Sequence, residues 1–234
     1  MADRREPAAD VSPIVLAAEI DARLRALPDQ NTPDRRVIRR DYSRMLRNAD
    51  PSLILDVARE LYNRYDQQGI ARELILYHRK AFRCLGEAEL EEFGRGINSW
   101  WSVDGFARDL AGRAWREGQV SDALIHRWAH SPDRWWRRVA SVSTVPLNVK
   151  AQGGTGDVPR TLEVCRLPAA DHDDMVAKGL SWALRELVRH DAEAVQVFLA
   201  EHGHVLAARV RREVRNKLTI GLKNPHKERG IGGA

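Results

Sequence analysis

Apolar residues recur at intervals of three and four along nearly the whole chain, from about residue 13 to residue 218. This spacing places them on one face of an α-helix, whereas strands would need runs of alternating apolar and polar residues, which we do not find. The pattern predicts an all-α protein. The expected helices lie near 13–27, 33–48, 51–65, 68–84, 87–95, 99–116, 119–130, 133–147, 160–167, 172–189, 191–202 and 205–218.

Capping and turn residues mark several of the breaks between these helices. Pro51 suits the first turn of a helix, and Ser131-Pro132-Asp133 marks a second break of the same kind. Ser121 and Asp191 are expected N-caps. The clearest loop is the segment 151–159, AQGGTGDVP, in which glycines favour flexibility.

Many short helices joined by short links favour a stack of paired antiparallel helices. HEAT-type pairs recur every ~40–47 residues, so about five or six pairs would fit this length. Such a solenoid curves, and its concave face forms a natural groove for a long partner. We expect one domain over residues 13–222, with flexible segments at 1–12 and 223–234.

Composition excludes several classes of protein. Apolar residues make up 43% of the 234 residues, enough for a substantial core. No apolar run approaches the ~18–20 residues of a membrane span, and the first residues lack the apolar stretch of a secretory signal. Cys84 and Cys165 form neither a spaced metal-binding pair nor a disulfide framework. We therefore expect a soluble intracellular globular protein.

The charge of the chain suggests a polyanionic partner. The formal net charge is +5, and only six of the 38 basic residues are lysine, which leaves 32 arginines. Arginine binds phosphate through a planar fork of N–H donors, which lysine lacks. The alternative at this point is that an arginine-rich genome simply encodes surface charge in this way.

Tryptophan is concentrated in the second half of the chain. All seven tryptophans lie between residues 100 and 182. Trp115, Trp128 and Trp135 are expected to fill the core. Trp182 differs, because it lies opposite the apolar stripe of its own helix together with three cations, Lys178, Arg185 and Arg189. Such a tryptophan either packs on a neighbouring helix layer or meets a ligand with an anionic backbone.

A second unusual segment carries an acidic residue beside tryptophan. Trp100, Asp104 and Arg108 are spaced four apart, along the edge of an apolar stripe that includes Val103 and Phe106. A carboxylate beside an indole lies in a partly dry setting, which suits an acid, a base or an electrostatic stabiliser. The alternative is an ordinary salt bridge between Asp104 and Arg108.

Two further segments carry clustered arginines. Arg134 and Arg138 lie four apart beside a stripe that turns Trp135, Val139 and Val142 inward. Residues 204–229 contain eight Lys or Arg against two Glu, a net charge of +6. Both segments suit contact with nucleic-acid phosphates without sequence readout, or else form solvated charged faces.

Four segments in order resemble one family, the HEAT-like-repeat DNA alkylation repair glycosylases of the AlkD type. The resemblance covers roughly residues 30–220. It rests on Trp100-Trp101-Ser102-Val103-Asp104, on Trp135-Trp136-Arg137-Arg138-Val139-Ala140, on Lys178-Gly179-Leu180-Ser181-Trp182-Ala183-Leu184-Arg185-Glu186, and on Arg211-Arg212-Glu213-Val214-Arg215-Asn216-Lys217-Leu218.

The resemblance implies a monomer that grips duplex DNA in the concave groove and hydrolyses the N-glycosidic bond of cationic N3- and N7-alkylpurines. It implies that Asp104 is catalytic, that Trp100 and Trp182 lie near the lesion, and that Arg138 holds a phosphate. Ser102 departs from the family, which often has a second acidic residue after the tryptophan pair, and a one-residue slip would make Trp101 the relevant ring.

The remaining expected contacts with DNA phosphates come from the basic faces described above. They are Arg134, Lys178, Arg185, Arg189, Arg211, Arg212 and Arg215. Because no lysine stands where a Schiff base obviously needs one, we expect hydrolysis without strand cleavage. The resemblance implies no metal and no cofactor, and it implies a cytoplasmic, nucleoid-associated bacterial protein. Small methyl adducts and bulky adducts are both compatible with the sequence.

Two other functions remain compatible with the sequence. A non-catalytic HEAT-repeat module would bind structured or branched DNA and release no base. A protein-binding HEAT scaffold would bind DNA no better than any other basic protein.

Overall fold

The structure, a computed structural model, describes residues 12–225, and every regular element in that range is helical. The all-α prediction is confirmed. The predicted flexible segments, 1–12 and 223–234, lie mostly outside the described residues. After Arg95 the chain divides into two compact units. The prediction of a single domain over 13–222 stays a prediction.

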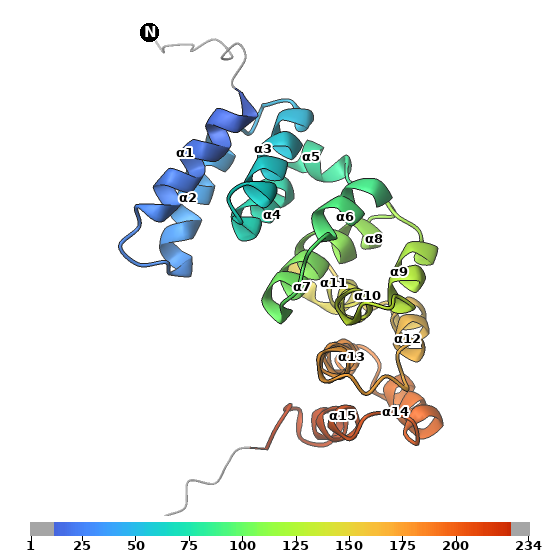
Figure 1. Cartoon of the computed structure of the whole chain (residues 1–234). Coiled ribbons are helices and arrows are strands. Elements are labelled where there is room, and N and C mark those ends of the chain that lie inside the picture. Colours follow the sequence, from blue (N-terminus) through green and yellow to red (C-terminus); the bar gives the residue numbers. More distant parts are fainter. Residues whose placement is uncertain (1–11, 226–234) are drawn as a thin grey trace, which may run out of the picture. The chain divides into compact units, whose positions relative to one another are not determined.

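The first unit is a set of packed helices in which α3 contacts α1 and α4, and α2 contacts α4 (Figure 1). Pro13 and Pro51 open their helices at the first position, as predicted for Pro51. The helices are α1 (Pro13–Arg25), α2 (Thr32–Met45), α3 (Pro51–Asn63), α4 (Gln68–Tyr77), α5 (Arg79–Arg83) and α6 (Glu87–Gly94).

The second unit stacks its helices in two layers (Figure 1). Helices α7, α10, α13 and α15 follow one another in one layer, and α9, α12 and α14 pack behind them. The elements are α7 (Trp100–Phe106), η1 (Ala107–Ala111), α8 (Gly112–Arg116), α9 (Asp122–Ala129), α10 (Arg134–Ser143), α11 (Val145–Asn148), η2 (Lys150–Gln152), α12 (Val158–Arg166), α13 (Asp174–Leu187), α14 (Ala192–His202) and α15 (Ala208–Ile220).

Three of the predicted helices depart from a single regular α-helix. The helix expected at 68–84 breaks at His78, whose Nδ1 accepts a hydrogen bond from the backbone N–H of Ala81 and so caps α5. The helix expected at 133–147 divides at Thr144, ahead of Pro146. The helix expected at 99–116 is continuous but contains a π-helical segment, η1, at its centre.

The expected N-caps meet different outcomes. The Asp191 carboxylate accepts a hydrogen bond from the N–H of Ala194 at 2.8 Å, so this cap is confirmed. Ser121 stands at the N-cap position of α9, but its side chain makes no capping hydrogen bond, so that part of the prediction is wrong. Asp122 is the first residue of α9, and its carboxylate accepts a hydrogen bond from the indole N–H of Trp115.

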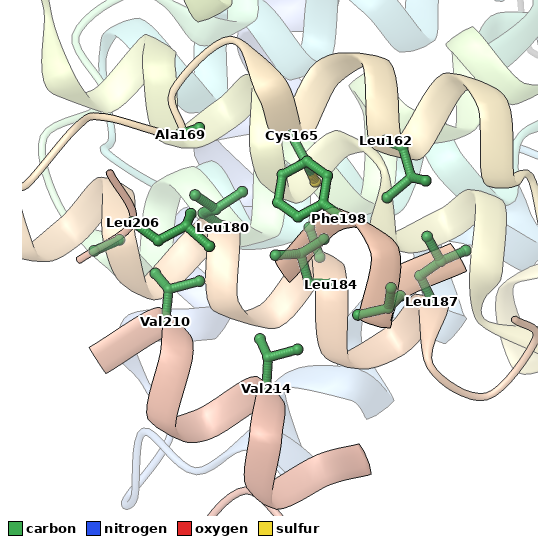
Figure 2. Close-up of a cluster of buried hydrophobic side chains, with 13 residues drawn as sticks. Leu162, Cys165, Ala169, Leu180, Leu184, Leu187, Phe198, Leu206, Val210 and Val214 are labelled. Carbon is green, nitrogen blue, oxygen red and sulfur yellow. The ribbon is translucent and has the colours of Figure 1, made fainter. Parts of the chain in front are cut away.

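The core of the second unit lies between its two layers. Figure 2 shows the part formed by α12, α13, α14 and α15, where Leu180, Leu184 and Leu187 meet Phe198 and Val214. Burial of each leucine or phenylalanine contributes about 2 kcal/mol. The predicted stripe of α13 is therefore its core face, and the opposite face of α13 is left for other contacts.

Trp115 and Trp128 are buried, as predicted. Trp135 is only half-buried, with the guanidinium of Arg134 over its ring at 4.9 Å, so the prediction that Trp135 fills the core is wrong. Its neighbour Trp136 packs instead on Trp128, at 5.0 Å between ring centroids, and on Phe106.

The glycine-rich segment is a loop over residues 153–157, but it is held in place rather than loose. The N–H of Gly154 donates to the Val149 carbonyl, and the Asn148 side chain accepts from the N–H of Asp157. A Cβ at Gly154 would stand 2.6 Å from the carbonyl carbon of Leu147. The glycine is therefore needed for close packing of backbone on backbone.

Candidate active site

Three polar caps set where the helices of the candidate site begin. Ser99 caps α7 through the N–H of Ser102, and Asp133 caps α10 through the N–H of Trp135. Asp173 caps α13 by accepting from the N–H groups of Met175 and Val176. Asp104, Arg138 and Trp182 come from the first two or three turns after these caps, where a fixed helix start also fixes their direction.

Asp104 on α7 and Arg138 on α10 form a two-pronged ion pair. Nε of Arg138 donates to one carboxylate oxygen of Asp104 and Nη2 donates to the other, both at 2.8 Å. The side chain of Asp104 is 15% exposed, and that of Arg138 is 6% exposed. A fork-to-fork pair with this burial fixes the orientation of the carboxylate.

A third contact locks the arginine. Nη1 of Arg138 donates to the carbonyl oxygen of Met175 on α13 at 2.5 Å. Gly179 makes room for this reach, because a Cβ there would stand 3.2 Å from Cγ of Arg138. Arg138 therefore ties α7, α10 and α13 together.

The alternative partner proposed for Asp104 is wrong. Asp104 pairs with Arg138, which is 34 residues away in sequence, and Arg108 turns instead toward α13. The guanidinium of Arg108 lies over the ring of Trp182, 5.8 Å from the centroid. This distance suits a cation–π interaction.

Trp182 is held at its polar end as well. Its indole N–H donates to the Glu186 carboxylate one turn further along α13, at 3.1 Å. The ring is half-buried and lines a cavity instead of joining the core. Trp182 is therefore outside the core, and its contact with a ligand stays a prediction.

An open cavity of about 390 Å³ lies beside the ion pair. Its wall combines indole rings with cationic side chains from α10, α13 and the residues after α15. The lining residues are Trp100, Arg138, Met175, Lys178, Trp182, Arg185 and Lys223. Asp104 is not among the lining residues, and its link to the cavity is the ion pair with Arg138, which does line it.

The structure distinguishes the two neighbouring tryptophans of α7. Trp100 and Trp101 are both more than half exposed, but only Trp100 is among the residues that line this cavity. Ser102, where the sequence departs from the family's acidic residue, is neutral, and its hydroxyl is used in the reciprocal cap with Ser99. A slip in register is therefore not needed to place an indole at the cavity.

The arginines and lysines expected to bind phosphate fall into separate groups. Lys178 and Arg185 line the cavity with Arg138, while Arg134 is exposed and pairs with Asp173. Arg189 and Arg212 are exposed. Arg211 donates to the Gly203 carbonyl, and Arg215 lines a different hollow between α14 and α15. The structure does not bring Arg211 and Arg215 to the candidate site.

Arg138 differs from the phosphate-binding side chain that the sequence predicts. It is buried, and all three of its nitrogens donate to groups of the protein. Its first role in this geometry is to hold Asp104, and a contact with phosphate stays a prediction.

Sequence reasoning missed Met175 and Lys223. Met175 contributes a backbone carbonyl, which no residue pattern reveals. Lys223 follows the end of α15, and only its place in a basic stretch could have marked it.

Two groups near the cavity have shifted pKa values. Burial lowers the pKa of the Arg185 guanidinium, and the nearby carboxylates of Glu213 and Glu186 only partly oppose this effect. The pKa of Asp173 is lowered as well. Its partial burial acts in the other direction, but the N–H groups of Met175 and Val176 and the side chain of Arg134 outweigh it.

Replacing the α13 cap tests how far that helix depends on it. We expect Asp173→Ala to lower the free energy of unfolding by about 1 kcal/mol at pH 7, measured by urea denaturation. Because the folded pKa of Asp173 lies below its unfolded value, this stabilisation is present above about pH 4 and is lost as the pH falls through the folded pKa. A difference between wild type and variant that is the same at pH 7 and pH 2.5 would contradict the assignment.

Neither a metal cluster nor a membrane span is found in the described residues. Over 12–225, no three His, Cys, Asp or Glu side chains gather as metal ligands would. In the same range no helix combines the length and the apolar character required to cross a bilayer.

Comparison with known proteins gives one match. A family model described as DNA alkylation repair enzyme matches residues 30–218, a range that holds all of the candidate site except Lys223. The chain matches no curated protein and no solved structure.

Proposed function

Because the chain belongs to the DNA alkylation repair enzyme family, whose fold is the HEAT-like repeat, we propose that it hydrolyses the N-glycosidic bond of cationic alkylated purines in duplex DNA. The observation that carries the proposal is the Asp104 carboxylate, held by Arg138, which lines a cavity walled by indole rings and cations.

The leaving group explains why one carboxylate is sufficient. An N3- or N7-alkylpurine is positively charged, so it leaves with the electron pair of the C1′–N bond as a neutral base and needs no general acid. As that bond lengthens, the positive charge moves to the sugar. An anion fixed in a partly dry site stabilises this charge most when it is already oriented.

Asp104 keeps the capacity to act on water while it is bound to Arg138. A carboxylate has about four acceptor positions, and the fork of Arg138 occupies two of them. The remaining positions accept a hydrogen bond from a water molecule and orient its oxygen toward C1′. The proton that this water loses passes to the carboxylate or to solvent.

Arg138 can contact a phosphate without releasing Asp104. Each terminal nitrogen of a guanidinium carries two N–H groups, and Nη1 and Nη2 each use one on the protein. The two that remain are free of these contacts and belong to a residue of the cavity wall. The charges of Asp104 and Arg138 cancel, so a phosphodiester bound to Arg138 would give the three groups together a net negative charge beside the sugar.

The indoles of Trp100 and Trp182 would contact deoxyribose and exclude water. Trp100 is 59% exposed, which is costly for an indole unless a ligand covers it. Their π-faces favour cations, and so favour the alkylated base and the developing sugar cation.

The expectation of hydrolysis without strand cleavage now rests on different grounds, since Lys178 and Lys223 both line the cavity. The ammonium of Lys178 lies 2.6 Å from the Asp174 carboxylate, and that of Lys223 lies 3.7 Å from Glu213. An ammonium paired with a carboxylate does not attack a sugar carbon. We still propose a monofunctional enzyme.

Product analysis tests the function. We expect DNA treated with a methylating agent to release N3- and N7-methylpurines and to retain intact strands with abasic sites, and we expect borohydride to trap no protein–DNA adduct. Binding of undamaged duplex without base release would instead support the non-catalytic DNA-binding module. A trapped adduct would contradict the monofunctional mechanism.

Trp182 offers a test of the indole contacts. We expect Trp182→Ala to lower the rate of excision about tenfold, equivalent to about 1.4 kcal/mol, while the melting temperature changes little, because the ring lies outside the core. Trp115→Ala is the matched control, since a fully buried tryptophan costs about 3–5 kcal/mol of stability. An equal loss of stability in both variants would show that Trp182 only fills space.

A further inference from the structure

The proposed reaction leaves unexplained a buried carboxylate on α15. Glu213 is 1% exposed, although it lies in a helix whose other charged residues are half-buried or exposed. A charge so deeply buried is costly unless it is paired and hydrogen-bonded. Its partners therefore indicate what it does.

Glu213 is the meeting point of a hydroxyl and three cations. The Ser181 hydroxyl on α13 donates to its Oε2 at 2.6 Å, and Nε of Arg185 lies 3.9 Å from the same oxygen. Its Oε1 accepts from Nη1 of Arg209 at 3.3 Å and lies 3.7 Å from Nζ of Lys223.

The charges of this cluster do not cancel. Arg185, Arg209 and Lys223 share the single negative charge of Glu213, and Arg209 has a second partner in Asp174. Asp174 in turn also binds Lys178. Glu186 also lies near Arg185 and pairs with Arg189, so three carboxylates serve five cations, which leaves positive charge in excess.

The excess charge faces the cavity. Arg185 and Lys223 both line it, together with Lys178. Nε of Arg185 also donates to the Ser181 hydroxyl, so the same serine connects Arg185 with the buried carboxylate. Glu213 thereby holds two cavity-lining cations from opposite sides, one on α13 and one just beyond α15.

We propose that Glu213 is a positioning residue that holds Arg185 and Lys223 as a two-cation site for a backbone phosphate of duplex DNA. The site rests on the proposed function only in taking DNA as the ligand. Excess positive charge repels a cationic base and attracts a phosphodiester, so this end of the cavity takes the backbone and not the lesion.

The direction in which Glu213→Gln changes the affinity for DNA distinguishes positioning from a simple effect of net charge. Glu213→Gln preserves shape and removes one negative charge near the cavity, so the net charge there rises by one. If only net charge mattered, the variant would bind DNA more tightly. With positioning lost, the three cations repel one another, and we expect binding of an undamaged duplex to weaken three- to tenfold.

The experiment measures the dissociation constant of undamaged duplex against salt concentration for the full chain. Arg185→Gln and Lys223→Gln should each lower the salt slope by about one. Glu213→Gln should add little to either variant, because its effect passes through these two side chains. Glu193→Gln, which removes an exposed carboxylate from α14, is the charge-matched control and should not weaken binding.

Circular dichroism and urea denaturation establish that the variants are folded. If Glu213→Gln fails to fold, Ser181→Ala replaces it, since it removes the 2.6 Å hydrogen bond and keeps every charge. We expect Ser181→Ala to weaken binding two- to threefold. Tighter or unchanged binding by the folded variant, or weakening that adds fully to that of Arg185→Gln, overturns the inference.

The binding measurements on the Glu213 variant and the measurement of base release can fail separately. A protein that excises alkylpurines while Glu213→Gln binds DNA more tightly would retain the proposed function and lose the phosphate site. A protein that releases no base but shows the expected coupling would retain the site and lose the function.

Discussion

Asp104→Asn is expected to lower the single-turnover rate of alkylpurine release by about 10²–10⁴-fold while duplex binding changes less than threefold. The amide keeps the size of the side chain but removes the negative charge that opposes the sugar cation. It also points an N–H₂ group at the donors of Arg138, so we expect a loss of about 1–3 kcal/mol in stability.

A neighbouring ion pair gives the matched control. Arg137 and Asp171 are joined at 2.7 Å and also connect α10 with the segment before α13, but they do not line the cavity. Asp171 is 17% exposed, close to the 15% of Asp104, while Arg137 is more exposed than Arg138. Asp171→Asn should cost comparable stability and leave the rate of excision within threefold of wild type. If Asp104→Asn and Asp171→Asn slow excision equally, the loss reflects destabilisation and not chemistry.

Arg138→Ala is expected to have the largest effect on stability among the variants of the candidate site, about 3 kcal/mol in urea denaturation. It leaves a largely buried carboxylate without its partner, and removing one member of a buried pair costs about 3–5 kcal/mol. The Met175 carbonyl loses its donor as well. Excision should fall with it, because nothing then fixes the orientation of Asp104.

Two further experiments on Arg138 distinguish the effect of its charge from the effect of its fork-shaped geometry. Arg138→Lys keeps the charge but cannot form the fork, so we expect excision to fall at least tenfold although binding of duplex is retained. In a double-mutant cycle, Asp104→Ala and Arg138→Ala together should cost about 2 kcal/mol less stability than the sum of the two. Additive costs would show that the pair is not coupled in solution.

The sequence predicts the helical architecture well because local patterns determine it. The apolar stripe from Val176 to Leu187 lies in the core, and the stripe from Val103 to Ala114 is buried as expected. The break at His78 was not predictable, because no proline or glycine marks it. It depends on a buried imidazole that caps the next helix, and this is decided by tertiary packing.

Helix α10 shows where periodicity fails. All residues from Arg138 to Ser143 are buried, because α10 packs on α7, α9 and α13 at once. A helix covered on three sides has no single inward stripe. For this reason the sequence assigned Trp135 to the core in place of Trp136, and treated Arg138 as a surface arginine.

The candidate site was only partly predictable for the same physical reason. Residues Trp100, Asp104 and Trp182 could be selected because each is unusual for its place on a helix. The partner of Asp104 could not, since sequence neighbours offer only Arg108 and the actual partner is 34 residues away. The basic residues of α15 point to different sides of that helix, so composition alone overstated their common role.

The most direct test of the account is the amount of free base that wild-type protein, in excess over substrate, releases from a duplex with a single N7-methylguanine. We predict release far above spontaneous depurination, with one abasic site per base and no strand break. If the duplex is bound at saturation and the base leaves at its spontaneous rate, Asp104 does not stabilise a sugar cation and the proposed chemistry is wrong.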